Sequence, residues 1–239
     1  MSDVPVSVVM PAFNEAEILT TSVKDVVTAM RGRAVPFELI IVENGSTDGT
    51  LALAKELALT FDEVRVEHLA DADYGRALRA GLLASRGTAI VNFDTDYYDL
   101  DFLDAAVVRV SAPDGPAIIV GSKRAVGATD TRAPLRKLAT SVFGTILRLG
   151  FGLSLSDTHG MKAMRRAAVE PLARECRFGQ DLFDTELILR AERAGLRTAE
   201  IPVDVHELRP ARTSILRRVP RTLVGLCRLR YSLWRDQRP

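Results

Sequence analysis

Short runs of β-branched and other apolar residues alternate with longer amphipathic stretches in the first half of the chain. Such runs fit strands buried on both faces of a parallel sheet, whereas the longer stretches have helical spacing. The predicted strands are residues 6–10, 37–42, 64–69, 88–93 and 117–121. The predicted helices are residues 15–30, 48–59, 74–85 and 101–110, the second of them capped by Ser46 or Thr47. This order predicts an α/β domain with a mostly parallel sheet flanked by helices.

The second half of the chain is less regular. Residues 134–150 and 181–194 have helical patterns, whereas residues 161–166 and 198–207 are predicted to be extended. No internal repeat or linker divides the sequence. We therefore expect one domain over residues 1–208 and a C-terminal amphipathic helical tail over residues 209–239.

Composition limits the class of protein. The chain has 239 residues, a formal net charge of +1, 47% hydrophobic and 26% charged residues, which is typical of a soluble globular protein. Two distant cysteines and three histidines without metal-type spacing predict neither a disulfide framework nor a zinc site. No signal-peptide pattern opens the chain, and no apolar run approaches the roughly 20 residues that cross a bilayer.

Three polar segments follow predicted strands: "PAFNE" after the first, "ENGSTDGT" after the second and "DTD" after the fourth. Ligands of such sheets bind at the carboxyl ends of the strands. Asp94 and Asp96 of "DTD" can hold Mg²⁺ or Mn²⁺, which prefer oxygen ligands and often bind substrate phosphates as well. Each segment alone also fits an ordinary loop. Their common position at one edge of the sheet indicates a ligand site.

In this order the segments resemble the inverting nucleotide-sugar glycosyltransferases of family 2, which have the GT-A fold. The family strings are approximately PxYNE, VDDGSxDGT and DAD, and here they read "PAFNE", "VENGSTDGT" and "DTD". Further on, "VGSKR", "SDTHGMKAMRR" and "FDTELILRAERAGLRTAEIPV" are similar to stretches of the dolichol-phosphate mannose synthase and polyprenyl-phosphate glycosyltransferase group. The resemblance covers about residues 6–214. It implies transfer of a hexose from a GDP- or UDP-sugar to a polyprenyl phosphate, with inversion.

The resemblance also implies roles for individual residues. Asp94 and Asp96 match the DxD carboxylates that reach the metal and the donor. The positions that match donor-binding residues are Pro11, Phe13, Glu15, Val42, Asn44, Asp94, Thr95, Lys123, Arg124 and Arg212. The positions assigned to catalysis are Asp96, Asp184, Glu186 and Arg209.

The chemistry of the acceptor separates two versions of the reaction. A hydroxyl acceptor needs a general base, for which Asp184 and Glu186 are the candidates, although their helix face can equally brace the metal loop. A lipid phosphate is already anionic and instead needs cations to hold it. The candidate cations are Arg136, Lys137, Arg209 and Arg212. Asp157 and Thr158 either cap a helix or face the acceptor.

Four positions depart from the family pattern. Asn44 replaces the usual aspartate, Tyr74 a lysine, Tyr98 a residue that is often glutamine, and Ile215 a phosphate-binding lysine. These departures leave open the alternative of a catalytically degenerate protein that only binds nucleotide sugars. A glycosyltransferase with a soluble hydroxyl acceptor is a further alternative. A nucleotidyltransferase is a weaker candidate, because it would need an early glycine-rich phosphate loop that this sequence lacks.

The C-terminal tail is strongly basic. Residues 209–238 contain nine arginines and one acid, and Leu223, Leu226, Leu229 and Leu233 recur between them at helical spacing. Such a helix is typical of a membrane-surface element, which predicts peripheral contact at the cytoplasmic, inner face of a membrane. The other interpretation is a helix that packs its leucines on the domain and exposes a basic face. Nucleic acid is not an expected partner, because aromatic residues are sparse in the tail.

Overall fold

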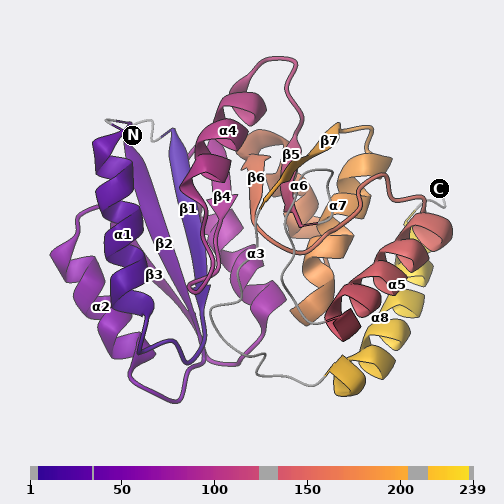
Figure 1. The fold of residues 1–239 in the computed structure, drawn as a ribbon, viewed down its shortest axis with the longest axis horizontal. Coiled ribbons are helices and arrows are strands. Elements are labelled where there is room, and N and C mark those ends of the chain that lie inside the picture. The colour runs from indigo at the N-terminus through magenta and orange to yellow at the C-terminus, as the bar shows by residue number, and fades with distance from the viewer. Residues whose placement is uncertain (1–4, 34, 124–133, 204–214, 237–239) are drawn as a thin grey trace.

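The computed structural model describes residues 5–33, 35–123, 134–203 and 215–236, and it contains one mixed β-sheet (Figure 1). The strands are β1 (Val6–Ala12), β2 (Phe37–Asn44), β3 (Val64–Leu69), β4 (Ala89–Asn92), β5 (Ile118–Ser122), β6 (Lys162–Arg165) and β7 (Thr198–Pro202). Their order in the sheet is β3-β2-β1-β4-β6-β5-β7. β6 runs antiparallel to β4 and β5, and the other neighbours are parallel. The predicted α/β class with a mostly parallel sheet is confirmed.

Helices cover both faces of this sheet. They are α1 (Leu19–Gly32), α2 (Thr50–Thr60), α3 (Tyr74–Ala84), α4 (Leu100–Ser111), α5 (Pro134–Phe151), α6 (Arg166–Glu175), α7 (Phe183–Arg193) and α8 (Ile215–Arg235), with a short 3₁₀ turn η1 (Gln180–Leu182) before α7. One hydrophobic core joins the sheet to α1, α2 and α4, and a second joins it to α3, α5, α6, α7 and α8. Successive residues of β1 alternate between these cores, as the period of a strand requires.

Three local features differ from the prediction. β1 continues through Pro11, which is tolerated because β4 pairs with β1 only as far as Val9. The side chains of Ser46 and Thr47 do not cap α2. Instead, Asp48 Oδ1 accepts the N–H of Thr50, the first residue of the helix, at 2.9 Å. Helix α6 was not predicted; it is short and contains Pro171, a residue that disfavours the interior of a helix.

The tail forms a helix, as predicted, and α8 lies beside α5 (Figure 1). Leu226, Leu229 and Leu233 are buried in the second core, whereas Leu223 is 45% exposed. Three of the four leucines therefore face the domain, and the leucine stripe is not a membrane-facing surface. The predicted domain boundary at residue 208 falls outside the described residues and stays a prediction. None of the helices in the described part of the chain is both long and apolar enough to span a bilayer.

Candidate active site

The first two polar loops are joined by hydrogen bonds where β1 and β2 end. Asn14 has a left-handed backbone (φ 55°); its N–H donates to Ser46 Oγ at 2.9 Å, and its Oδ1 accepts the Thr47 N–H at 2.8 Å. The N–H of Glu15 donates to Thr50 Oγ1 at 2.8 Å. "PAFNE" and "ENGSTDGT" therefore form one rigid unit at the expected edge of the sheet.

The residues predicted to line the donor base differ in exposure within this unit. Pro11 and Val42 are buried in the strands, whereas Phe13 is 40% exposed. Asn44 is buried, and its Oδ1 accepts the N–H of Asp73 at 2.8 Å. This bond ties the end of β2 to the beginning of α3. The amide at position 44 thus has a structural partner that the sequence did not reveal.

Glu43 supports the same loop from inside the protein. Its Oε1 accepts the Ser46 N–H at 2.6 Å, and its Oε2 lies 2.5 Å from His68 Nδ1. Burial acts to raise the pKa of Glu43, but the hydrogen bonds from Ser46 and His68 outweigh it, and the pKa is lowered. The loop after β2 is therefore held by an ionised carboxylate.

The DxD segment turns directly after β4. Asp94 is half-buried and forms a backbone bridge with Tyr97, whereas Asp96 is exposed. The hydroxyl of Tyr74, at the start of α3, donates to Asp94 Oδ1 at 3.0 Å. Burial and then the Asp94 carboxylate raise the pKa of Tyr74 well above its usual range, so its hydroxyl remains a donor. A neutral tyrosine thus contacts the first DxD carboxylate at the position where the family pattern has lysine.

A buried ion pair lies behind this segment. The Nζ of Lys162, on β6, is 2.8 Å from Asp184 Oδ1 and 2.8 Å from the carbonyl oxygen of Gly160. Lys162 is fully buried and Asp184 is only 3% exposed. The pKa of Asp94 is raised, first by burial, while the carboxylates of Asp96 and Asp184 act to raise it further and Lys162 acts to lower it. The structure therefore brings Asp184 and Lys162 into electrostatic contact with the DxD carboxylates.

Sequence reasoning singled out Asp184 but missed Lys162. The only signal for Lys162 was its place in "SDTHGMKAMRR", in a short extended segment, where a basic residue is readily taken as exposed. Lys162 is buried instead, because its strand β6 pairs with β4 and β5 and so lies in the interior of the sheet. A lysine on an interior strand is enclosed by the helices that cover the sheet.

Glu186, the other candidate base, has different contacts. Its Oε2 accepts the backbone N–H groups of Arg177 and Phe178 at 2.8 and 2.9 Å, and its Oε1 accepts a bond from Arg190 at 2.9 Å. These bonds use both carboxylate oxygens to hold the loop before η1. Glu186 thus braces the loop before η1 and not the metal loop, whereas Asp184 is the candidate beside the DxD segment.

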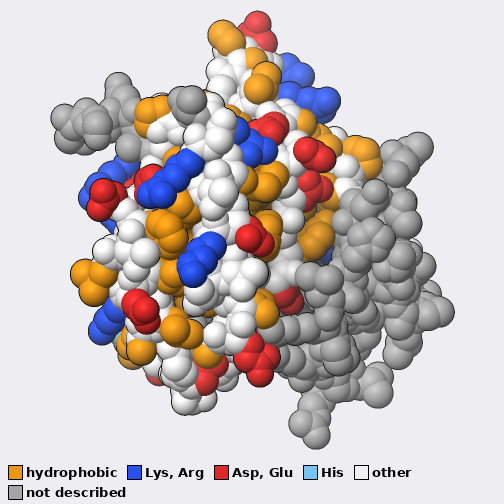
Figure 2. Space-filling view, turned by 60° about the vertical axis from the view of Figure 1, so that its left-hand side comes forward, with side chains coloured by type: hydrophobic (Ala, Val, Ile, Leu, Met, Phe, Trp, Pro, Cys, Tyr) orange, Lys and Arg blue, Asp and Glu red, His pale blue; other side chains and the backbone are white. Residues whose placement is uncertain are grey.

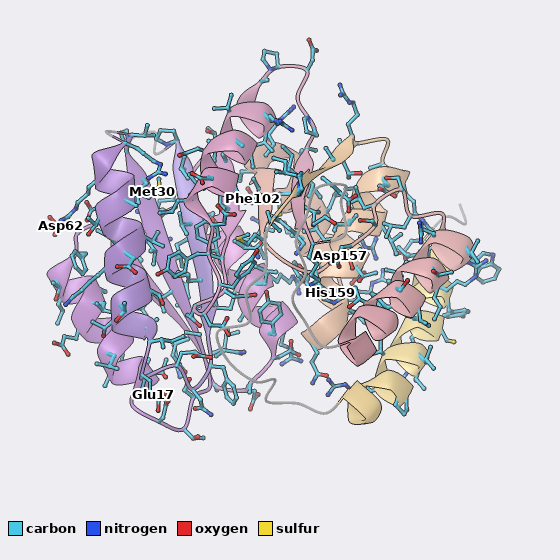
Figure 3. All side chains as sticks on the ribbon, in the orientation of Figure 1. Glu17, Met30, Asp62, Phe102, Asp157 and His159 are labelled. Carbon is cyan, nitrogen blue, oxygen red and sulfur yellow. The ribbon has the colours of Figure 1, made fainter. Side chains whose placement is uncertain are left out.

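Lys123 and Asp157 meet at the carboxyl end of β5, two strands from β4 at the same edge of the sheet. Lys123 Nζ lies 3.4 Å from Asp157 Oδ2, and Asp157 Oδ1 accepts the His159 N–H at 3.0 Å within its own loop. The ring of His159 lies 5.4 Å from that of Phe143 on α5, where Figure 3 shows His159 close to Asp157. This loop therefore connects the strand end at Lys123 with α5. The side chains of Arg136 and Lys137, and all of Arg124, Arg209 and Arg212, lie outside the described part of the structure.

Tyr98 turns away from the DxD carboxylates. Its hydroxyl donates to Asp25 Oδ2, on α1, at 2.7 Å, and its ring lies 6.3 Å from that of Phe93. Thr95, between the two DxD aspartates, is buried, and its carbonyl oxygen accepts a bond from Ser22 at 2.6 Å. Two contacts to α1 thus fix the turn, and Tyr98 has a structural role where the family pattern has a residue on the metal side.

The carboxylates of the DxD segment fit a divalent cation whose coordination is completed by substrate phosphates. Among the described residues, no group of three or more His, Cys, Asp or Glu side chains is arranged to hold a metal by itself. Burial first, and then the negative charge of Asp96 and Asp184, raise the pKa of Asp94, and a bound cation would offset that negative charge. Mg²⁺ is usually bound by one or two carboxylates together with substrate phosphates. Asp94 and Asp96 are suited to that arrangement.

Comparisons with known proteins agree with this geometry. A family model described as Glycosyl transferase family 2 matches residues 7–172. Glycosyltransferase AglD of Haloferax volcanii is 35% identical over 206 residues, which cover 84% of this chain but only 33% of that protein. Polyprenol monophosphomannose synthase of Mycolicibacterium smegmatis is 30% identical over 209 residues, covering 84% of this chain and 77% of that protein.

A solved structure shows the same fold. Glucosyl-3-phosphoglycerate synthase from Mycobacterium tuberculosis, in complex with Mn²⁺, UDP-glucose and phosphoglyceric acid, has a TM-score of 0.64 at 23% identity. The match covers 86% of this chain and 73% of that one. The expected GT-A fold is thereby confirmed.

Proposed function

Because the chain belongs to glycosyl transferase family 2, we propose that it moves a hexose from a GDP- or UDP-sugar to a polyprenyl phosphate, with inversion. Two kinds of relative support the two substrates. The M. smegmatis relative is named for the synthesis of polyprenol monophosphomannose, and the structural neighbour binds UDP-glucose with Mn²⁺. The chain matches one third of the length of AglD, so only that third of AglD bears on the proposal.

The donor occupies the edge formed by the first two loops and the DxD segment. The partly exposed ring of Phe13 offers an apolar surface to the base, and the joined loops hold it in place. Asp94 and Asp96 would hold a divalent cation, which would offset the charge that develops on the departing diphosphate. Tyr74 orients Asp94 through its hydroxyl. Lys123, which follows β5 at the same edge of the sheet, supplies positive charge.

The observation that favours a phosphate acceptor is the ion pair between Lys162 and Asp184. A hydroxyl acceptor would have to give its proton to a base, and Asp184 is the carboxylate beside the DxD segment. Protonating Asp184 would leave Lys162 as a buried cation without its counter-charge, which costs several kcal/mol. A phosphate acceptor attacks with an oxygen that is already anionic and needs no such transfer. Asp184 then serves as a positioning residue.

The donor half of the proposal is tested by thermal unfolding with GDP-, UDP- and dTDP-sugars, in Mn²⁺ or EDTA. We expect one donor to raise the melting temperature only with Mn²⁺, and Asp96→Ala to lose this effect. Asp62→Ala, an exposed acid before the amino end of β3 and far from the carboxyl ends of the strands, is the matched control and should behave as wild type (Figure 3). A shift that survives in Asp96→Ala would contradict the role of the DxD segment.

The acceptor half is tested with a short-chain polyprenyl phosphate and the matching polyprenol. We expect transfer to the phosphate alone, and inversion is read from the anomeric coupling in the NMR spectrum of the product. Faster transfer to the alcohol would replace the proposal with the hydroxyl-acceptor reaction. Donor binding without transfer to either would indicate a protein that only binds nucleotide sugars.

A further inference from the structure

Helix α8 has an inner side that packs on the domain and an outer side that does not. Leu226, Leu229 and Leu233 are on the inner side and are buried. At about 100° per residue, four exposed residues follow one another on the opposite side of the helix. These residues, which we call the outer stripe, are Val224, Cys227, Tyr231 and Trp234. Val224 is 53% exposed, Tyr231 62% and Trp234 45%, so the outer stripe is a solvent-facing apolar surface.

Basic residues border the outer stripe. Arg221, Arg228 and Arg235 recur every seven residues, so they share one edge of the stripe, and all three are exposed. On the other edge, Arg230 extends toward α5, where its guanidinium lies 5.8 Å from the centre of the Phe151 ring. The outer side of the helix therefore combines an apolar centre with positive flanks.

Acidic residues are absent from this outer side in the described part of α8. The acid that follows its last turn, Asp236, accepts hydrogen bonds from Arg177 and Arg190 at 3.1 and 2.9 Å. It is thus held against the domain. By contrast, Figure 2 shows acidic and basic side chains interspersed on the side of the molecule that carries α1 and α2. The exclusively positive charge is therefore a property of the outer side of α8 and not of the protein surface as a whole.

We propose that the outer stripe and its three bordering arginines form a docking surface for an anionic lipid bilayer. Tyrosine and tryptophan are favoured at the membrane interface, because one end of each side chain is apolar and the other polar. The rings of Tyr231 and Trp234 are neighbours, with centres 5.9 Å apart. Arginines beside them attract anionic headgroups. The purpose of docking rests on the proposed lipid acceptor, but the surface itself is defined by α8 alone.

This surface differs from the one that the leucine pattern predicts. A membrane-facing leucine stripe would require α8 to leave the domain and expose Leu226, Leu229 and Leu233. The outer stripe lets α8 remain packed on the second core while it contacts lipid. Docking therefore needs no unfolding of the tail.

Trp234 is the only tryptophan in the chain, so its emission reports this surface without a label. The protein is titrated with phosphatidylcholine vesicles, with and without phosphatidylglycerol. We expect a blue shift and quenching by brominated lipid with the anionic vesicles, both weakened by salt. Val224→Ser/Tyr231→Ser should abolish the blue shift. Replacing Arg221, Arg228 and Arg235 by glutamine should weaken partitioning roughly 100-fold, a factor of several for each charge.

Matched controls come from α4. Val108 is 72% exposed and Arg109 is also exposed, so Val108→Ser/Arg109→Gln makes one change of each kind away from α8 and should partition as wild type. No blue shift with either vesicle, or an equal loss in the α4 variant, would overturn the inference. So would a dimer in sedimentation that Val224→Ser/Tyr231→Ser dissociates, because a second copy would then cover the surface. If the protein partitions into anionic vesicles but transfers no sugar, the proposed function is wrong and the docking surface still stands.

Discussion

The Nζ of Lys162 lies 2.8 Å from Oδ1 of Asp184, and both side chains are buried between the sheet and α7. A buried ion pair adds little net stability when both charges are present, because the desolvation of the two ions offsets their attraction. Its loss is costly when one partner is removed. This pair also connects the interior strand β6 with the first turn of α7, directly behind the DxD segment.

Lys162→Met should strongly destabilise the protein. The change leaves the Asp184 carboxylate buried without its counter-charge, which typically costs about 3–5 kcal/mol. Urea unfolding measures the loss. The double variant Lys162→Met/Asp184→Asn removes both charges and should recover most of the stability. If the single and double variants are equally unstable, the loss comes from packing and not from the unpaired charge.

Tyr74→Phe should weaken metal binding while it leaves the fold largely intact. The change removes the hydroxyl that donates to Asp94 Oδ1 at 3.0 Å, and one such bond contributes about 1 kcal/mol to stability. Removing a partner that orients a metal ligand typically lowers metal affinity about 10-fold. The measurement is an electron paramagnetic resonance titration of Mn²⁺ in the presence of UDP. Tyr231→Phe, on α8, is the control and should match wild type; unchanged affinity in Tyr74→Phe would show that Asp94 needs no such orientation.

Alkaline pH should destabilise the protein through Tyr98. Burial and the hydrogen bond to Asp25 raise the pKa of Tyr98 from 10.0 to about 12. Because the folded protein favours the neutral phenol, this contribution to stability is complete below pH 10 and is lost as the pH rises through about 12. Denaturant unfolding between pH 9 and about 12 measures it. In Tyr98→Phe this part of the pH dependence should disappear, and a profile identical to wild type would assign the loss to other groups.

Gly75→Ala should be far more harmful than an alanine at another helical glycine. A Cβ at Gly75 would lie 2.6 Å from the carbonyl carbon of Gly179 and 2.7 Å from the N of Gln180, and both are backbone atoms. A Cβ at Gly150, on α5, would meet no described atom beyond its own helix within 4 Å, so Gly150→Ala should be neutral or stabilise by up to about 1 kcal/mol. Thermal unfolding compares the two variants. Equal melting temperatures would show that the loop before η1 moves freely away from α3.

The sequence by itself determined the class of fold, because strand and helix periods and their alternation depend only on neighbouring residues. It also placed the three polar loops at one sheet edge, since parallel strands bring their carboxyl ends together. Asp94 and Asp96 could be assigned for that reason. The roles of the individual donor-binding and catalytic residues stay predictions.

Tertiary structure alone decided which side chains are partners. The antiparallel insertion of β6 buries Lys162 opposite Asp184, and no local pattern contains that pairing. The bonds of Asn44 to Asp73, Tyr74 to Asp94 and Tyr98 to Asp25 each join segments more than 15 residues apart in the chain. Packing also selected which side of α8 is buried, because helical spacing shows that a helix has two faces but not which one meets the core.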